Sequence, residues 1–485
     1  MSRVELTRRR PHTFGVVVFV TMIVLIPLMG AVPGKASPAA SQAVGCQPTW
    51  PVIAHHAGGQ VVALPLGTRR PVACATPTGY ATSESTIAVG RDNTLVYSPA
   101  QSENTVARST DGGATWSLAR PSFEQPTAFW NTVDPDLISD RRTGWIFWSH
   151  ATGPVRNEGG LPDNAGFYLA AASGFQVYSS SDGARTFRTA DYSSAPTGDW
   201  EKIFVGPPPP ASSGAPQPKG YPDVVYLCAN SPLEVTGPGR LCYKSLDGGL
   251  TFTMVGYVSP SVGEPPDICS PLNFNTGVVD AYGNTYQPAT CQDHAYVVVS
   301  HDEGTSYQWR VVSGVPTGVS PGDNYLQLAL DDAGNLYAMW PAGGQLFLAI
   351  SRDHGLSWQP PLMVSAPGIR NATLPSLSAG ATGRVAIAYY ANPDATASML
   401  DGYITETTDA LGSQPLFYSG MLNDPAHPIF HDYGLSSTPR ADFIGGAYDQ
   451  KGLQFWAGMV KQLGPLQPNG EIETTGYVGR LNWMG

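Results

Sequence analysis

The segment Ser245-Leu246-Asp247-Gly248-Gly249-Leu250-Thr251-Phe252 shows a pattern that occurs five times along the chain. The pattern is Ser, any residue, Asp, any residue, usually Gly, any residue, Thr or Ser, and an aromatic residue. The five segments span residues 109–116, 180–187, 245–252, 300–307 and 351–358, with the aspartates Asp111, Asp182, Asp247, Asp302 and Asp353. These aspartates are 71, 65, 55 and 51 residues apart. Self-similarity at such a period is typical of a propeller or another repeat array rather than of separate domains.

Each segment has the chemistry of a hairpin turn. The Asp carboxylate can accept backbone N–H groups across the turn, and Gly allows a positive φ angle. The hydroxyl of Thr or Ser ties the far side of the turn, and the aromatic ring packs beneath the loop. The pattern therefore predicts five turns, each of which joins two antiparallel strands.

The repeated pattern resembles the Asp box, also called the BNR repeat, of sialidases and related β-propellers. The resemblance extends through the boxes over nearly all of the chain that follows its N-terminal segment. It implies an all-β fold, a β-propeller of four-stranded blades, in which each box forms the turn between strands C and D. It also implies that these turns lie on the rim opposite the ligand site, so the five aspartates are expected to be structural.

Short strand-like runs bounded by turn residues surround the boxes and can be grouped into blades. In the fifth unit, residues 326–330, 335–340 and 346–351 are rich in apolar and aromatic residues and are expected to be strands A, B and C. The same grouping places blades at residues 84–120, 134–190, 200–258, 272–315, 324–365 and 373–420. The sixth keeps only a remnant of the box, Thr407-Thr408-Asp409.

A last set of three strands, at residues 442–447, 453–459 and 475–481, lacks a fourth. We expect residues 60–64 to supply it and to close the ring, because closure leaves no free sheet edge. This grouping favours seven blades, with six as the alternative. Residues 60–485 then form a single propeller domain, preceded by a lead-in at residues 37–59.

The composition agrees with a β-rich fold that has many turns. Of 485 residues only 13% are charged, 54 are Gly and 44 are Pro, while 42% are hydrophobic and 10% aromatic. Coiled coils and long surface helices are excluded, and there is ample material for a core. The net charge of −11 comes without a basic cluster in the body of the chain. Nucleic acid and anionic membrane surfaces are therefore not expected as partners.

Residues 1–36 have the layout of a secretory signal peptide. Arg8, Arg9 and Arg10 precede an apolar run at residues 14–29, and small residues then allow cleavage after Ala36 or Ala43. The run is shorter than the roughly 20 residues that a membrane-spanning helix needs, so no membrane span is expected after cleavage. A lipoprotein-type anchor at Cys46 is an alternative. We expect a secreted or cell-surface protein.

The chain has six cysteines. In an exported protein such cysteines favour disulfides, although six allow 15 connectivities. Their order suggests the pairs Cys46–Cys74, Cys228–Cys242 and Cys269–Cys291. The middle pair is best supported, since residues 224–228 and 241–243 resemble neighbouring antiparallel strands. A zinc site is disfavoured because no close Cys pair has suitably spaced His residues.

Acidic residues precede most of the predicted A strands. They are Glu84, Asp134, Asp136, Asp199, Glu201, Glu264, Asp267, Asp323, Asp432 and Asp442. The resemblance implies that the loops entering strand A, together with the B-to-C loops, surround the ligand. Converging on a central channel, these acids would form a negative mouth that is able to bind a cation such as calcium or the hydroxyls of a sugar. The alternative is that they cap loop turns and remain solvated.

The resemblance to sialidases also implies a set of catalytic residues. That family holds the substrate carboxylate with three arginines and uses a Tyr activated by a Glu as nucleophile, with an Asp as acid/base. Here Tyr433, Glu201 and Asp136 are the candidates for catalysis. The candidates for substrate binding are Arg156, Arg240, Arg370 and Arg440. The family's early Arg-Ile-Pro motif is absent, and Arg69-Arg70-Pro71 is the nearest string.

The sequence therefore favours an exported, sialidase-like propeller that recognises or processes extracellular glycans at its channel mouth. Because the arginine motif is missing, a binding scaffold is favoured over a true sialidase-type glycoside hydrolase. A propeller that binds other proteins is the remaining alternative. No cofactor is expected to be required, and the oligomeric state is not indicated.

Overall fold

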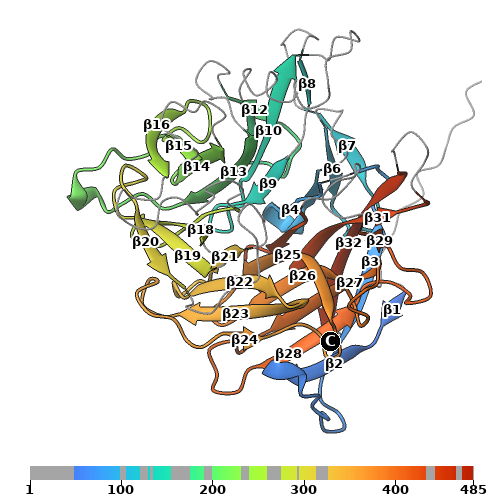
Figure 1. Cartoon of the computed structure of the whole chain (residues 1–485). Helices are drawn as coiled ribbons and strands as arrows, with labels where there is room; N and C mark the ends of the chain where they lie inside the picture. Colours follow the sequence, from blue (N-terminus) through green and yellow to red (C-terminus); the bar gives the residue numbers. More distant parts are fainter. Residues whose placement is uncertain are drawn as a thin grey trace, which may run out of the picture. The chain divides into compact units, whose positions relative to one another are not determined.

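The computed structural model describes residues 48–82, 84–98, 105–120, 129–131, 135–154, 175–190, 199–230, 240–258, 275–291, 294–312, 326–432, 443–465 and 472–483. All of them belong to one compact unit, Ala43–Gly485. This unit is a seven-bladed β-propeller of mostly four-stranded antiparallel blades (Figure 1). The prediction of an all-β propeller with seven blades is confirmed.

The innermost strands, here called the A strands, surround a central axis. They are β4 (Ile87–Val89), β9 (Asp136–Ser139), β13 (Asp199–Gly206), β17 (Val278–Val279), β21 (Gln327–Leu330), β25 (Asn371–Ala379) and β30 (Gly445–Tyr448). Each A strand contacts the next around the ring, and β30 contacts β4. The ring is therefore closed.

The B strands lie next outward, followed by the C strands. The B strands are β5 (Leu95–Tyr97), β10 (Ile146–Pro154), β14 (Val224–Asn230), β18 (Thr285–Cys291), β22 (Leu336–Ala342), β26 (Val385–Asn392) and β31 (Phe455–Gln462). The C strands are β6 (Val106–Ser109), β11 (Phe175–Ser180), β15 (Arg240–Ser245), β19 (His294–Ser300), β23 (Gln345–Ser351), β27 (Met399–Thr407) and β32 (Thr474–Trp483).

The D strands complete the blades. They are β7 (Ser117–Ala119), β12 (Arg188–Thr189), β16 (Thr253–Val258), β20 (Gln308–Val311), β24 (Leu362–Met363), β28 (Leu416–Met421) and β3 (Pro71–Pro77). Four additional strands, β1 (Thr49–Trp50), β2 (Val52–His56), β8 (Phe129–Asn131) and β29 (Phe430–His431), extend individual sheets. Helical structure in the described residues consists of short 3₁₀ turns, η1 (Ala57–Gly59), η2 (Arg91–Asn93) and η4 (Ala211–Ser213).

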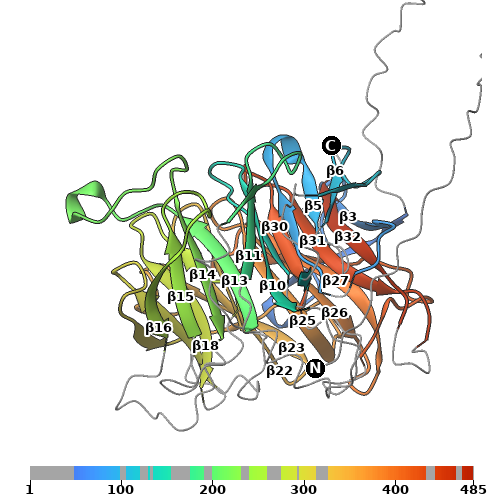
Figure 2. The same ribbon diagram turned by 90° about the horizontal axis from the view of Figure 1, so that it is seen from above.

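The ring closes through a strand near the N-terminus, but not through the predicted one. The fourth strand of the seventh blade is β3, which pairs with the C-terminal strand β32 over the whole length of β3 (Figure 2). Residues 60–64 instead fold back on β2 through one bridge between His55 and Val61. Gly58 and Gly59, with φ of 81° and 78°, reverse the chain there. The prediction that residues 60–64 close the ring is wrong.

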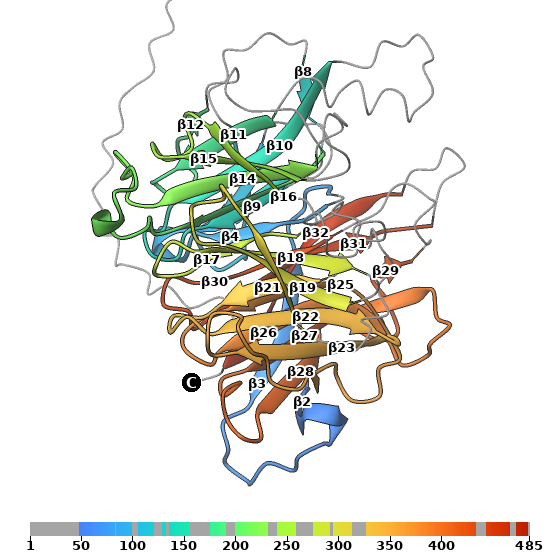
Figure 3. The ribbon, with the colours of Figure 1, turned by 60° about the vertical axis from the view of Figure 1, so that its left-hand side comes forward.

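The strand β2 extends the sixth blade beyond its fourth strand. It pairs antiparallel with β28, so blade 6 gains an outer strand (Figure 3). The buried His55 ring places Nε2 2.8 Å from Ser419 Oγ, which lies on β28. The N-terminal segment is thus attached to blades 6 and 7.

The five boxes form the C-to-D turns, with the hydrogen bonds that their chemistry predicts. In the fifth box, Ser351 Oγ donates to Asp353 Oδ1 at 2.8 Å, and the backbone N–H of Ser357 donates to the same oxygen at 2.9 Å. The Ser357 hydroxyl donates to Asp353 Oδ2 at 2.5 Å. In blade 6 the remnant of the box keeps part of this hydrogen-bond pattern. Asp409 Oδ1 accepts from Thr407 Oγ1 at 2.8 Å and from Leu416 N at 3.0 Å.

Replacing Asp353 with alanine is expected to lower the free energy of unfolding by about 1–2 kcal/mol, because three hydrogen bonds at an exposed turn are lost. Urea denaturation of the variant and of Glu473→Ala, whose carboxylate is exposed and outside the boxes, measures the difference. Equal stability of Asp353→Ala and the unaltered protein would show that the boxes do not stabilise the blades.

The core lies between neighbouring blades, where, for example, Phe204 and Tyr226 of blade 3 cluster with Val279 and Val298 of blade 4. The rings of Phe204 and Tyr226 are parallel with centroids 5.2 Å apart, and those of Tyr390 and Phe430 are 4.2 Å apart. A disulfide joins Cys228 of β14 to Cys242 of β15 within blade 3, as predicted. Cys46, Cys269 and the Cys291 side chain lie outside the described residues, so the other two pairings stay predictions. Among the described residues, no helix is long and apolar enough to cross a membrane.

Candidate functional site

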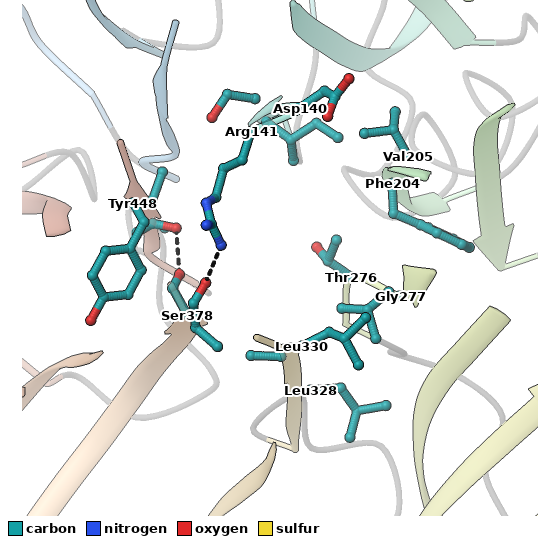
Figure 4. Close-up of a pocket in the computed structure, with 18 of the residues that line it drawn as sticks. Asp140, Arg141, Phe204, Val205, Thr276, Gly277, Leu328, Leu330, Ser378 and Tyr448 are labelled. Carbon is teal, nitrogen blue, oxygen red and sulfur yellow. Dashed lines mark hydrogen bonds between the residues drawn. The ribbon is translucent and has the colours of Figure 1, made fainter. Parts of the chain in front are cut away.

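A cavity of about 490 Å³ runs along the propeller axis and is lined by the A strands of all seven blades (Figure 4). We call the end at which the A strands begin the front of this channel, and the end at the A-to-B turns the back. In five blades, the loop that enters the A strand at the front lies wholly or in large part outside the described residues. The residues of the channel are therefore described from the back, where the strands are anchored, to the front.

Buried aspartates anchor the A-to-B turns at the back. Asp280 accepts N–H bonds from Tyr282 and Asn284 at 2.9 and 3.0 Å, and its other oxygen accepts the Tyr286 hydroxyl at 2.8 Å. Asp331 repeats this arrangement in blade 5 and accepts the Tyr337 hydroxyl at 2.9 Å. These turns fix where each A strand ends along the axis, and hence which residues face one another across the channel.

One level of the channel, nearer the front, is polar. In five blades a polar residue lies four positions before the first residue of the A-to-B turn. These residues are Thr86, Asp136, Thr276, Gln327 and Ser376, and the corresponding turns begin at Gly90, Asp140, Asp280, Asp331 and Gly380. All five line the cavity, and we call them the polar layer. Their equal distance from the turns places hydroxyl, amide and carboxyl groups from five blades at one height.

Two members of the polar layer also connect blades. Leu137 N donates to Thr86 Oγ1 at 3.1 Å, and Ile203 N donates to Asp136 Oδ2 at 2.7 Å. The side chains of Thr276, Gln327 and Ser376, in blades 4, 5 and 6, make no hydrogen bond within the part of the chain that the structure describes. One side of the layer is therefore engaged in the fold, and the other side presents neutral polar groups to the cavity.

A cluster of buried charges adjoins the engaged side of the polar layer. It consists of Asp136 on β9, Glu201 and Lys202 on β13, and Arg240 at the start of β15. Glu201 and Arg240 are 0% exposed. Arg240 Nη2 donates to Cys228 O at 3.1 Å, and Lys202 Nζ lies 4.1 Å from the centroid of the Phe443 ring. We call these four residues the charged cluster.

The charges in this cluster compensate one another in part. Burial lowers the pKa of Arg240 to about 9, although Tyr307, Asp136 and Glu201 favour its charged form. Burial raises the pKa of Asp136 above its usual value, while Lys202 and Arg240 act in the opposite direction. Asp136 is thus a carboxyl group that retains its proton more readily than one in water.

Irregularities in two A strands lie beside these residues. In β13 the pairing with β14 shifts by one residue between Asp199 and Lys202, which is a β-bulge. In β25 a similar shift lies between Thr373 and Ser376, and Leu374 there has a positive φ of 47°. Bulges re-aim side chains and are frequent next to functional sites. Here they precede Lys202 and Ser376 at the front half of the channel.

The Arg141 side chain lies along one side of the back of the channel and extends toward Ser378 and Tyr448. It starts in the A-to-B turn of blade 2 and reaches blades 5, 6 and 7 (Figure 4). Its Nη2 lies 2.7 Å from Asp332 Oδ1, its Nη1 donates to Ala379 O at 3.0 Å, and its Nε donates to Asp449 O at 3.3 Å. One guanidinium therefore ties together blades on opposite sides of the ring.

The structure brings together three of the site residues proposed from the sequence. Asp136, Glu201 and Arg240 share the charged cluster. Arg370 is exposed in the turn before β25 and does not line the channel. The remaining three candidates, Arg156, Tyr433 and Arg440, lie outside the described residues. No group of three or more His, Cys, Asp or Glu side chains suited to a metal occurs among the residues that the structure describes.

The neutral members of the polar layer were not proposed from the sequence. The available signal was their constant spacing from the Asp of the A-to-B turn, as in Thr276-Gly277-Val278-Val279-Asp280 and Gln327-Leu328-Ala329-Leu330-Asp331.

The fold defines the chain as a seven-bladed propeller, and solved structures of this architecture resemble it at low sequence identity. No protein-family model and no characterised protein sequence matches the chain. A protein of unknown function from Dyadobacter fermentans is 12% identical with a TM-score of 0.44, over 84% of this chain and 99% of the other. The intramolecular trans-sialidase from Ruminococcus gnavus is 13% identical with a TM-score of 0.42, over 84% and 96% of the two chains. YCF48 bound to D1 peptide is 11% identical with a TM-score of 0.42, over 87% and 99%.

Proposed function

We propose that this protein is an exported propeller that binds extracellular carbohydrate at the front of its central channel. The polar layer carries the proposal. Sugar hydroxyls donate and accept hydrogen bonds, and the hydroxyl, amide and carboxyl groups of the layer offer both functions at one level of an axial cavity. A cavity of about 490 Å³ is within the usual range for small-ligand sites.

Export is supported by the N-terminal signal pattern and by the disulfide between Cys228 and Cys242. Disulfides persist in oxidising compartments, so the pair is consistent with a protein outside the cytoplasm. We propose that the protein is secreted or held at the cell surface. Its partner would then be a glycan or glycoconjugate met there.

Glycoside hydrolysis is a second candidate function, and Asp136 favours it. Most glycoside hydrolases use two carboxyl groups, one of which must be protonated to act as general acid. Burial raises the pKa of Asp136, and Glu201 supplies a second carboxyl group in the same cluster. In the sialidase type of this reaction, Tyr433 would be the nucleophile.

A glycan array probed with the purified secreted protein tests carbohydrate binding. Asp136→Asn keeps an acceptor for Ile203 N but removes the charge and the acid, and we expect it to weaken binding about tenfold. Asp92→Asn, in the exposed A-to-B turn of blade 1 and outside the cavity lining, is the matched control and should bind as the unaltered protein does. Absence of binding to every glycan, or equal binding by Asp136→Asn, would refute the proposal.

Hydrolysis of a fluorogenic α-sialoside, measured beside the array, tests the second candidate. If the protein is a sialidase-type hydrolase, Asp136→Asn should lower turnover by a factor of about 10² or more. Tyr433→Phe and Arg440→Ala should also abolish it. Turnover no higher than the blank would remove the sialidase reaction from consideration and leave binding as the function.

A further inference from the structure

We propose that the back of the channel, between the polar layer and the A-to-B turns, binds a small neutral aromatic molecule that stacks on the guanidinium of Arg141. This site goes beyond the proposed carbohydrate binding and does not depend on it. Three features of the structure support the proposal. The cavity reaches solvent at the A-to-B turns, its wall places apolar side chains opposite the guanidinium, and its charged groups are bonded within the protein.

The cavity reaches solvent at the back of the propeller. Asp332 and Arg142, in the A-to-B turns of blades 5 and 2, line the cavity, and their side chains are 53% and 55% exposed. The long A-to-B connection of blade 3, which includes η4, extends outward from the ring (Figures 1 and 2). A small molecule can therefore enter between the turns at this end.

Four partly exposed apolar side chains form one part of the cavity wall. They come from four consecutive blades and are Ile138, Val205, Val278 and Leu330. All four lie between the polar layer and the A-to-B turns, along a stretch of strand about 13 Å long that has room for two fused aromatic rings. A ring that covers these side chains removes apolar surface from water, which favours binding.

The guanidinium of Arg141 lies opposite part of this apolar wall. Figure 4 shows the guanidinium on one side of the open centre and Val205 on the other. Its Nη2, Nη1 and Nε contact Asp332 Oδ1, Ala379 O and Asp449 O at 2.7, 3.0 and 3.3 Å. Such bonds lie in the plane of the group, so they hold it by its edges and leave a face for stacking on an aromatic ring.

The charged groups that line the cavity favour a neutral ligand. Arg141 pairs with Asp332, and Arg142 donates to both carboxylate oxygens of the buried Asp223. Lys202 packs over an aromatic ring. Carboxyl groups also outnumber cations in the lining. An anionic ligand would have to compete with these partners, and taking a cation from a buried carboxylate is costly.

The polar layer adds hydrogen-bonding partners at the deep end of this site. The side chains of Thr276 and Gln327 line the cavity and make no hydrogen bond within the part of the chain that the structure describes. A hydroxyl or N–H group at one end of the ring can bond to them while the ring lies along the apolar wall. The ligand class is therefore that of phenols and indoles, which are neutral at pH 7.

Calorimetric titration of the purified secreted protein with 2-naphthol tests the proposal. Two analogues each change one property, since trans-2-decalol lacks the aromatic rings and 2-naphthoate carries an anionic group. We expect one molecule of 2-naphthol to bind per chain. It should bind about three- to tenfold more tightly than the decalol, which cannot make the cation–π contact, and at least as far ahead of 2-naphthoate.

Two pairs of variants place the ligand in the cavity. Leu330→Trp fills the space with an indole and should weaken 2-naphthol binding more than tenfold, whereas Leu356→Trp, at a position that is 70% exposed, should not. Arg141→Leu should reduce the advantage of 2-naphthol over the decalol to less than about twofold. Arg384→Leu, in the A-to-B turn of blade 6 and outside the cavity lining, should preserve that advantage. Thermal melting of each variant checks that its fold is retained.

The results that would overturn the proposal differ from one part of it to the next. Undetectable binding of 2-naphthol, or binding that Leu330→Trp leaves unchanged, would refute a site at the back of the channel. Equal affinity for 2-naphthol and the decalol, or an advantage that persists in Arg141→Leu, would refute stacking on the guanidinium. Binding of 2-naphthoate as tight as that of 2-naphthol would refute the preference for a neutral ligand.

Discussion

Replacing Arg240 with methionine is expected to lower the free energy of unfolding by roughly 3–5 kcal/mol, the usual cost of removing one partner from a buried ion cluster. Arg240 is 0% exposed, so water cannot take its place beside Asp136 and Glu201. Methionine fills much of the same volume, which makes lost charge compensation the main effect. Equilibrium denaturation with guanidinium chloride at pH 7 gives the difference.

Two further variants identify the cause of that loss. Glu201→Gln in the Arg240→Met background removes one of the uncompensated carboxylates and should restore part of the stability. Arg370→Met changes the same side chain at an exposed position and should alter stability by less than about 0.5 kcal/mol. If Arg240→Met were no more damaging than Arg370→Met, the charged cluster would not be a stabilising unit.

The blades could be predicted from the sequence because their signals are local. A box such as Ser351 to Trp358 contains all of its own hydrogen-bonding partners, so the turn can be inferred without knowledge of the rest of the chain. The strands follow from the same turns, since each box fixes the ends of two of them. Six of the seven blades were therefore predicted at the residues where the structure has them. For the seventh blade three strands were predicted correctly, and the fourth was assigned to the wrong segment.

Ring closure could not be predicted in the same way because it depends on contacts between distant segments. The strand β3 includes Pro71, Pro77 and three small residues, Ala73, Cys74 and Ala75, which give a weak strand signal. These small residues suit a close approach to blade 6, where a Cβ on Gly420 would lie 2.5 Å from that of Ala73. Tertiary packing thus selects a segment that strand propensity disfavours.

The candidate site was predicted in part for a similar reason. Asp136 and Glu201 could be placed near the channel because they precede or begin A strands, a position that turn residues define. Arg240 could not be placed in this way. It joins Asp136 and Glu201 because the connection between strands B and C of blade 3 brings the start of β15 beside them. The bulge before Lys202, which brings two successive charged residues into the cluster, leaves no signal in the local composition.

Replacing Glu406 with glutamine is expected to stabilise the protein at alkaline pH and to remove much of the pH dependence of its stability. Glu406 lies on β27, is 1% exposed, and faces Trp483 and Leu481 of β32 in the neighbouring blade. Burial raises its pKa from 4.5 to about 8, although Arg384 and Trp483 oppose the rise. At neutral pH the folded protein therefore keeps a proton that the unfolded chain releases.

The sign of the effect follows from this difference in bound protons. Below pH 4.5 both states hold the proton and Glu406 leaves stability unaffected by pH. Between 4.5 and about 8 the unfolded chain binds fewer protons, so the free energy of unfolding falls by up to about 1.4 kcal/mol per pH unit. Above that range the loss is complete, and the carboxylate is charged in both states.

Denaturation curves of the unaltered protein and of Glu406→Gln from pH 4.5 to 9 test this expectation. The two stabilities should be similar at the acidic end and should diverge in favour of the variant, to a difference on the order of 4 kcal/mol at the alkaline end. The exposed Glu473→Gln, which also removes one carboxylate, should follow the unaltered protein at every pH. Parallel curves for the protein and Glu406→Gln would mean that Glu406 is ionised in the folded state, and that the contact between blades 6 and 7 tolerates a buried charge. Divergence would instead show that alkali destabilises this contact, which lies beside the place where the N- and C-terminal strands complete the ring.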